Sequence, residues 1–275
     1  MLLTLMIGTA VGLVLGLTGA GGSLFAVPLL MLGLGLGATE ATGLALGAVA
    51  SSALWGVFQR LNRKEVVWLP ALVLAAGGGL MAPLGRWLAG MTAEIWLLVG
   101  FSLLVLVVAA SMWRQAQREP DRVRVTRATG RSGSVVENGA ALCQFSASGR
   151  LELGLRCLGG IVMGGLIAGL LSGLFGVGGG FVIVPLLILA TGLSMTQAVA
   201  TSLVVIAIIG SVGFASHLWL GSHVDLDLLA LLATGGVAGM VLGSALARRL
   251  AGPNLQKLFV VLMLLLTAAS LAKSL

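Results

Sequence analysis

The chain has 275 residues, of which 58% are hydrophobic and only 9% are charged, and its mean hydropathy is +1.11. Soluble domains carry about 25% charged residues, and several apolar runs here exceed the roughly 20 residues that span a bilayer as a helix. The composition therefore excludes a soluble globular protein and predicts an all-α polytopic integral membrane protein.

The net charge of +7 is concentrated in a few connecting segments. This distribution is typical of cytoplasmic loops, which carry an excess of lysine and arginine. No groove-reading motif is present, so we expect membrane lipids and no nucleic acid among the partners. The first residues, MLLTLMIGTA, have neither a basic n-region nor an A-x-A cleavage site, so no removable signal peptide is expected. Cys143 and Cys157 have no histidine or cysteine partners at the spacing of metal ligands, and they are expected to be unpaired thiols.

An unusual cluster of glycines interrupts the second half of the chain. The stretch GLFGVGGGFVIVP runs from Gly173 to Pro185 and opens with five glycines in eight residues. Glycines loosen a helix, and a proline removes one more backbone hydrogen bond. In lipid, loosened backbone is tolerated only where it is buried in protein or lines a polar cavity. The stretch therefore predicts a broken helix at membrane depth.

A degenerate copy of this stretch, GLTGAGGSLFAVP, runs from Gly16 to Pro28. When Pro28 is aligned with Pro185, the two halves share one register well beyond the glycines. The residues that agree are Gly16/Gly173, Leu17/Leu174, Gly19/Gly176, Gly21/Gly178, Gly22/Gly179, Val27/Val184, Thr39/Thr196, Ala41/Ala198 and Gly56/Gly213. Because the register is common to the whole half, we interpret it as an internal duplication.

The hydropathy divides the chain into two membrane repeats, residues 1–112 and 157–275, joined by a polar connector, 113–156. In the first repeat, the short apolar pieces 2–17 and 24–36 flank the glycines, and spans follow at 38–58, 66–87 and 95–112. The second repeat has short pieces at 158–172 and 181–190, and spans at 196–220, 228–247 and 255–271. The connector is rich in arginine, and its partial alternation indicates short strands or a hairpin, with a disordered linker as the alternative.

Two topologies fit these spans. If each glycine segment crosses the membrane once, each half has four spans and the repeats are parallel. If each segment folds back as a re-entrant hairpin, each half has three full spans and the repeats are inverted. Only the inverted arrangement places the loop with Asp225 and Asp227 outside and Arg248 and Arg249 inside, as the positive-inside rule requires. We therefore favour inverted repeats, each a glycine-broken re-entrant hairpin followed by three transmembrane helices.

A helix that begins at each break would offer a binding site for an anion. The first backbone N–H groups of such a helix, around Gly22 and Gly179, have no carbonyl partner and carry the positive end of the helix dipole. Two such ends that face each other would bind a small anion without any arginine. Pro28 and Pro185 would also release carbonyls one turn earlier. The alternative is that the glycines serve only tight helix packing.

The paired motifs, together with ATSL at Ala200–Leu203, resemble the TauE/SafE family of sulfite exporters. The resemblance covers nearly the whole chain apart from the connector, although Ser23 replaces the third glycine in the first motif and Leu44 and Ala45 stand where Thr201 and Ser202 do. It implies transport of sulfite, thiosulfate, sulfonates or other small organic anions across the bacterial inner membrane. Substrate, direction, coupling ion and oligomeric state stay open, a homo-oligomer being one alternative.

Hydroxyl side chains near the breaks are further candidates, because hydroxyls donate to sulfonate oxygens. The predicted substrate-binding residues are Thr18, Gly19, Gly21, Gly22, Ser23, Gly176, Gly178, Gly179, Gly180, Thr201 and Ser202, with Pro28 and Pro185 as helix-break prolines. His217 and Arg60, which occupy equivalent positions, are expected to be interface residues. No aspartate or glutamate falls clearly inside a span, which points to an anion or a neutral solute rather than a cation.

Two other functional classes make different predictions. A membrane scaffold or sensor would use the glycines for packing alone and would show no substrate flux. An intramembrane enzyme is not expected, because the chain has no HExxH motif, no paired membrane carboxylates and no serine–histidine constellation. We expect no catalytic residues, no metal site and no cofactor.

Overall fold

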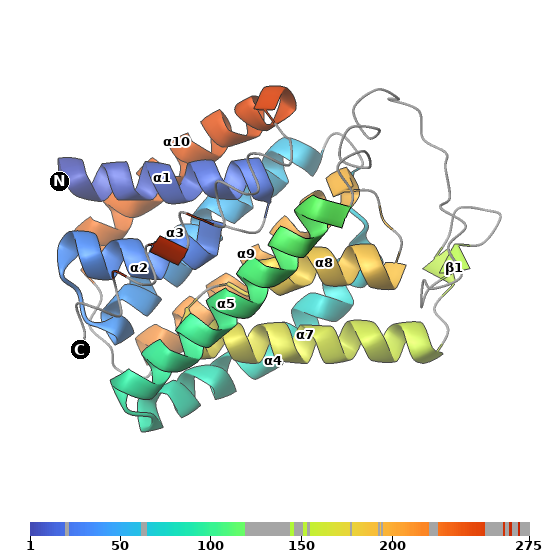
Figure 1. Ribbon diagram of the computed structural model, residues 1–275, viewed down its shortest axis with the longest axis horizontal. Helices are drawn as coiled ribbons and strands as arrows, with labels where there is room; N and C mark the ends of the chain where they lie inside the picture. The colour runs from blue at the N-terminus through green and yellow to red at the C-terminus, as the bar shows by residue number, and fades with distance from the viewer. Residues whose placement is uncertain are drawn as a thin grey trace.

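The structure is a computed structural model that describes residues 1–19, 22–61, 65–118, 144–145, 151–152, 155–176, 178–191, 193, 195–219, 225–250, 261, 264–265 and 269 (Figure 1). Its helices are α1 (Leu2–Thr18), α2 (Gly22–Leu34), α3 (Ala38–Leu61), α4 (Trp68–Met91), α5 (Glu94–Arg118), α7 (Leu155–Phe175), α8 (Gly180–Thr191), α9 (Met195–Trp219) and α10 (Leu226–Leu250). The predicted last span, 255–271, lies almost wholly outside these residues.

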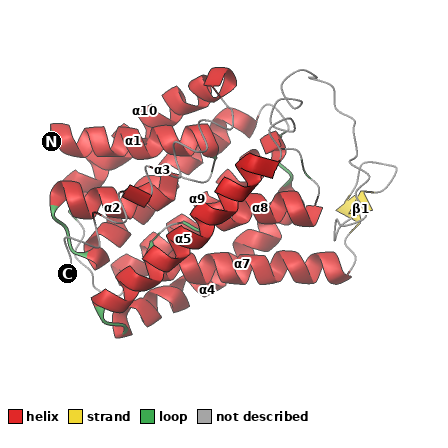
Figure 2. Cartoon of the chain, in the orientation of Figure 1, coloured by secondary structure: helices red, strands yellow, loops and turns green. Residues whose placement is uncertain are grey.

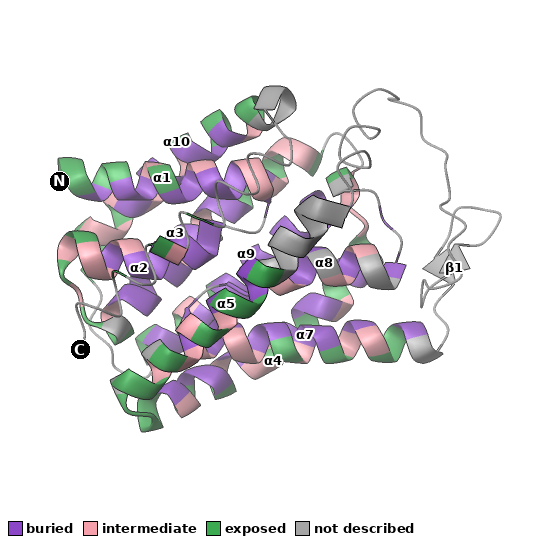
Figure 3. Cartoon of the chain, in the orientation of Figure 1, coloured by how far each residue is buried: buried purple, intermediate pink, exposed green. Residues whose placement is uncertain are grey.

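The described helices confirm an all-helical polytopic membrane protein (Figure 2). Five of them contain stretches long and apolar enough to cross a bilayer: Thr39–Leu61, Trp68–Met91, Cys157–Phe175, Thr196–Trp219 and Leu226–Leu246. Large apolar side chains such as Leu80, Leu103 and Met163 lie exposed on these and neighbouring helices, while the buried residues gather on the inward faces (Figure 3). Such an exterior suits lipid rather than water, because an apolar surface of this extent is rare on soluble proteins.

Each glycine segment is the turn of a helical hairpin. In the first half, a Cβ added to Gly22 would lie 2.6 Å from the Leu15 Cβ, and one added to Gly33 would lie 2.7 Å from Ile7. In the second half, Gly179 contacts Ala168 and Gly164 contacts Leu186. In both hairpins the residue number rises along one helix as it falls along the other, so the helices are antiparallel. The predicted fold-back at each break is therefore present.

One expectation about the hairpins is wrong. The piece before the second break was predicted to be short, 158–172, but α7 has 21 residues and a 19-residue stretch of it is apolar enough to span. Helix α7 extends three residues beyond each predicted end. At its C-terminal end, Leu174 and Phe175 continue the helix to Gly176. The helix before the first break, α1, is shorter, with 17 residues.

The closest helix contacts are made between the two halves of the chain. Helix α1 packs parallel to α10, and α7 packs parallel to α4, so each hairpin lies against a helix of the other half (Figure 1). A Cβ added to Gly12 would lie 1.9 Å from the Gly236 carbonyl oxygen, and one added to Gly169 would lie 2.1 Å from that of Gly78. Gly12 and Gly169 are equivalent residues in the sequence register. Any larger side chain at either position would force the helix backbones apart.

The central pair of helices, α3 and α9, occupies equivalent positions in the two halves and runs antiparallel. Gly43 near the start of α3 contacts His217 near the end of α9, whereas Gly56 near the end of α3 contacts Leu203 near the start of α9. The C-terminal ends of α3 and α9 therefore lie at opposite ends of the molecule. Both helices are largely buried and form much of the apolar core.

The connector is described only in part. Helix α5 continues to Arg118, beyond the predicted end at 112, and strands β1 (Gln144–Phe145) and β2 (Leu151–Glu152) pair antiparallel. This short hairpin agrees with the alternation in the sequence. Cys157 is disulfide-bonded, so the expectation of an unpaired thiol there is wrong, and Cys143 lies outside the described residues.

Candidate functional site

The two breaks begin in the same way. Helix α1 ends at Gly19, which has a φ of 73° and donates its N–H to the Leu15 carbonyl at 2.7 Å. Helix α7 ends at Gly176, which has a φ of 69° and donates to the Ser172 carbonyl at 2.8 Å. A left-handed glycine is a common way to end a helix, because a side chain is unfavourable in that conformation.

Each break is held by the long central helix of the opposite half. A Cβ at Gly19 would lie 2.2 Å from Val199 on α9, and a Cβ at Gly176 would lie 2.3 Å from Thr42 on α3. Val199 and Thr42 are equivalent residues. These two glycines are therefore required by both backbone angle and packing, and no open space adjoins their Cα atoms for a ligand.

Gly178 and Gly179 shape the start of α8, and both have a φ of 66°. The Gly179 carbonyl accepts hydrogen bonds from the N–H groups of Val182 at 3.1 Å and Ile183 at 3.3 Å. The N–H groups of Gly180 and Phe181 consequently fall in the first turn, where the helix itself supplies no acceptor. The start of α8 is thus a buried, partly positive helix end, as the sequence predicts.

The start of α2 lies close to this second break. Ser23, the second residue of α2, is fully buried, and its Cβ would lie 3.7 Å from a Cβ added at Gly178. The same added atom would lie 3.5 Å from Val49 on α3 and from Ile206 on α9. The breaks therefore approach each other where the two central helices pass. Gly178 differs from Gly19, Gly22, Gly176 and Gly179 in that no described residue comes closer than 3.5 Å to a Cβ added there.

The remaining glycines of the predicted set are placed as follows. Gly22 packs tightly on Val11 and Leu15, and Gly180 is buried as the first residue of α8. Gly21 lies outside the described residues. Helices α2 and α8 run through Pro28 and Pro185, so neither proline ends its helix.

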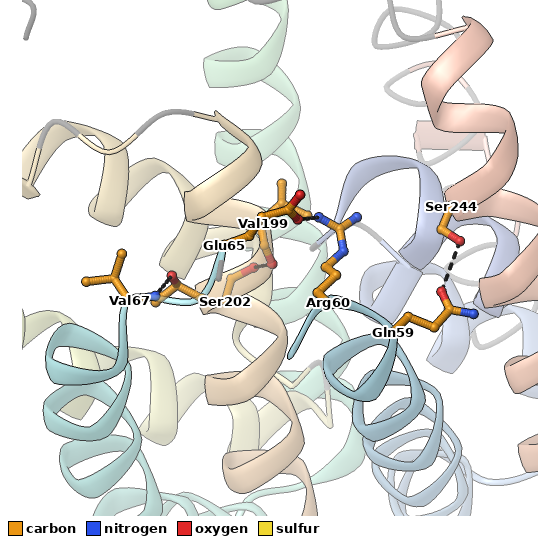
Figure 4. A network of polar contacts seen from close by, with 8 residues as sticks. Gln59, Arg60, Glu65, Val67, Val199, Ser202 and Ser244 are labelled. Atoms are coloured by element: carbon orange, nitrogen blue, oxygen red, sulfur yellow. Dashed lines mark hydrogen bonds and ion pairs between the residues drawn. The ribbon is translucent and has the colours of Figure 1, made fainter. Parts of the chain in front are cut away.

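The hydroxyl candidates do not gather around one point. Thr18 Oγ1 donates to the Val14 carbonyl at 2.8 Å within its own helix. Thr201 Oγ1 accepts from the Val67 N–H at 3.1 Å, before the first turn of α4. Ser202 Oγ lies 2.9 Å from the Val199 carbonyl oxygen (Figure 4). It also lies 3.2 Å from the carbonyl oxygen of Gly19. Ser202 therefore reaches the first break, whereas Thr201 supports α4.

A small cavity lies beside the second break, and its most polar residue is one that the sequence analysis did not single out. It has a volume of about 30 Å³ and is lined by Pro28, Thr39, Thr42, Arg86, Phe101 and Phe175 among others. Arg86 is only 7% exposed although it lies within the apolar run of α4. The sequence does contain a signal for Arg86, because it is a charged residue within the predicted span 66–87. Hydropathy alone places it near the end of that span, where a charged side chain would reach water.

Two more buried polar side chains adjoin the breaks. His217 is fully buried, and neither of its ring nitrogens has a hydrogen-bond partner among the described residues. The expectation that it is an interface residue is therefore wrong, whereas its counterpart Arg60 is partly exposed and ion-paired with Glu65 at 3.7 Å (Figure 4). Ser172 Oγ is likewise buried with no partner in the described part of the chain, one helical turn after Ala168, which contacts Gly179.

Comparison with known proteins decides the family. The family model described as "Sulfite exporter TauE/SafE" matches residues 4–270. The chain belongs to the TauE/SafE family. It is therefore a membrane transporter and not an enzyme, and the family implies a small substrate. Within the described residues, no group of three or more His, Cys, Asp or Glu side chains is placed to hold a metal ion.

Individual members of the TauE/SafE family agree with this assignment. The chain is 30% identical over 253 residues to a "Probable membrane transporter protein" of Xylella fastidiosa (strain Temecula1 / ATCC 700964), covering 91% of this chain and 86% of that protein. It is 24% identical over 252 residues to the "Probable membrane transporter protein YunE" of Bacillus subtilis (strain 168), covering 89% and 88%. No solved structure matches the chain.

Proposed function

We propose that this transporter moves a small anion, sulfite or a related oxidised sulfur compound such as an organosulfonate, bound between its two glycine breaks. The observation that carries the proposal is the approach of Ser23 to Gly178 at the buried centre of the protein. The start of α2 and the start of α8 both lie there. Each would direct the N–H groups of its first turn and the positive end of a helix dipole toward the same small region.

The chemistry of this region favours an oxyanion. Sulfite and sulfonate present three oxygens that accept hydrogen bonds, and the first turn of a helix offers several N–H donors in a small solid angle. Glycine at 178 leaves the backbone accessible, because the nearest side-chain atoms lie 3.5 Å or more from where a Cβ would be. The nearest neighbours of that position, Val49 and Ile206, are apolar and fully buried, so they would exclude water and strengthen each hydrogen bond.

We propose further that the halves are inverted repeats, each a re-entrant hairpin followed by three transmembrane helices, and that they work by alternating access. The antiparallel run of the equivalent helices α3 and α9 supports this, because equivalent helices of parallel repeats would share one direction. Secondary transporters commonly place the substrate between inverted repeats at broken helices. Rocking of one hairpin against the other would open the central site to each side in turn.

The same proposal orients the protein in a bacterial inner membrane. The basic loop 59–65 and the arginine-rich connector 113–156 would face the cytoplasm, and the loop before α10 would face outward. The disulfide at Cys157 opposes this orientation, since disulfides persist mainly outside the reducing cytosol. The charge pattern supports a cytoplasmic connector, because it is repeated in several loops.

Anion binding by purified protein tests the proposal. Thermal unfolding would be followed in detergent with sulfite, thiosulfate, sulfoacetate and phosphate, for the wild type and for Gly178→Leu. We expect at least one sulfur oxyanion to stabilise the wild type and not the variant. Gly178→Ala has the same backbone strain with little added volume, so it separates strain from filling of the site. Equal stabilisation of wild type and Gly178→Leu would contradict the central site.

A further inference from the structure

The cavity beside the second break has the composition of an anion-binding pocket. Its polar lining consists of Arg86 from α4 and the hydroxyls of Thr39 and Thr42 from α3, and the other lining residues are apolar. None of the lining residues is acidic. A pocket with a few converging polar groups in an apolar wall is the usual form of a small-ligand site.

The burial of Arg86 is costly unless it serves a purpose. A charged residue inside a membrane span is unfavourable, and such residues commonly mark substrate pathways. Arg86 lies beside the end of α7, because a Cβ at Gly173 would be 2.8 Å from the Arg86 backbone nitrogen. The negative end of the α7 dipole there offsets part of this cost. A bound anion would offset more of it.

His217 lies at the same level of the molecule. Helices α4 and α9 are parallel where Gly78 contacts Ile209, and Arg86 and His217 each lie about two turns further along their helices. His217 also contacts Gly43, the neighbour of the cavity residue Thr42, with 2.3 Å between its Nε2 and an added Cβ. Both ring nitrogens of this fully buried side chain lack a partner among the described residues, which indicates a missing polar ligand nearby.

Among the described residues, the polar side chains of this pocket are not repeated in the other half. In the register of the helix contacts, Ser244 stands where Arg86 does, and it lies 3.3 Å from the Gln59 side-chain oxygen instead (Figure 4). Val199 stands at the position of Thr42 and packs on Gly19. The duplication has therefore kept the glycine packing in both halves and the cationic pocket in one.

We propose that Arg86, with Thr42, binds the oxyanion head group of the substrate in a second subsite, at the end of the protein where α4 ends and α3 begins. This inference rests on the proposed anion transport. It adds a second binding position, in one half of the protein, on the path by which the anion enters or leaves. The volume of about 30 Å³ holds roughly two waters, which suits a small head group and excludes a bulky organic one in this conformation.

Sulfite binding to purified full-length variants tests the subsite by titration calorimetry. Arg86→Gln should weaken sulfite binding roughly 10- to 100-fold, since it removes a charge-assisted hydrogen-bond donor. Arg86→Lys, which keeps the charge but loses the planar fork, should fall between that variant and the wild type. Arg60→Gln, which removes another helix arginine, should bind as the wild type does.

A second variant guards against misfolding of Arg86→Gln. Thr42→Val introduces the side chain that the other half already packs against its glycine, so it should fold and still weaken sulfite binding. If Arg86→Gln and Thr42→Val both bind sulfite like the wild type, the subsite is wrong while the central site stands. If Arg86→Gln is less stable yet binds sulfite normally, Arg86 only supports the end of α7. If the wild type binds none of the four anions, both the subsite and the proposed function fail.

Discussion

Ser23 and Gly178 lie against each other at the centre of the protein, with 3.7 Å between the serine Cβ and the position of a Cβ on the glycine. They belong to different halves, and each lies at the start of the second helix of its hairpin. This contact brings together two segments that are separated by most of the chain. It brings the two helix breaks into one buried region, which is where we propose that the anion binds.

The glycine contacts between the halves should limit stability. The methyl group added by Gly12→Ala would lie 1.9 Å from the Gly236 carbonyl oxygen. The methyl group added by Gly169→Ala would lie 2.1 Å from the Gly78 carbonyl oxygen. Overpacking of this kind typically costs about 1–3 kcal/mol, so both variants should unfold at lower temperature in detergent. Gly79→Ala is the matched control, because its added atom would be 3.9 Å from Val212. A control that is destabilised as much as the two variants would contradict the packing account.

Ser202 should act by positioning the first break and not by binding substrate. Its hydroxyl lies within hydrogen-bond distance of the carbonyls of Val199 and Gly19, and its equivalent in the other half is Ala45. Ser202→Ala should therefore lower the free energy of unfolding by about 0.5–1.5 kcal/mol and leave the KM for sulfite unchanged. A large rise in KM with unaltered stability would show that the hydroxyl binds the anion.

The general plan could be read from the sequence because it depends on local chemistry. The glycine segments 16–28 and 173–185 combine several glycines with a proline, so the sequence predicts the ends of α1 and α7 within a few residues of Gly19 and Gly176. The sequence also predicts the fold-back at each break, since loop charge favours it over a single crossing. The choice of partner helix was not. The spacing of Gly8, Gly12 and Gly16 indicates close packing, but it does not say that α10 is the partner.

The candidate site was harder to predict, since burial depends on tertiary contacts. Arg86 and His217 both lie near the ends of apolar runs, where charged and polar residues usually reach water. Both turn inward instead, because α3 and α7 cover them. Thr201 and Ser202 stand next to each other in the sequence but bond to different helices, α4 and α1, which no motif could reveal.

Cysteine labelling should reveal the orientation of the repeats. Single cysteines at Glu65 and at Asp225, introduced in a background without Cys143 and Cys157, occupy the loops after α3 and after α9. Because α3 and α9 are antiparallel, a membrane-impermeant maleimide should label the two positions from opposite sides of the membrane. In intact cells we expect labelling at 225 and protection at 65. Labelling of both from the same side would exclude inverted repeats.

Transport by reconstituted protein tests the central claim most directly. Sulfite flux would be measured in proteoliposomes that contain the wild type, Gly178→Leu, or the control Gly159→Leu, whose added Cβ would meet nothing within 4 Å. We predict sulfite flux for the wild type and for Gly159→Leu, and none for Gly178→Leu at equal protein incorporation. Sulfite flux through Gly178→Leu at the wild-type rate would contradict a site between the two breaks.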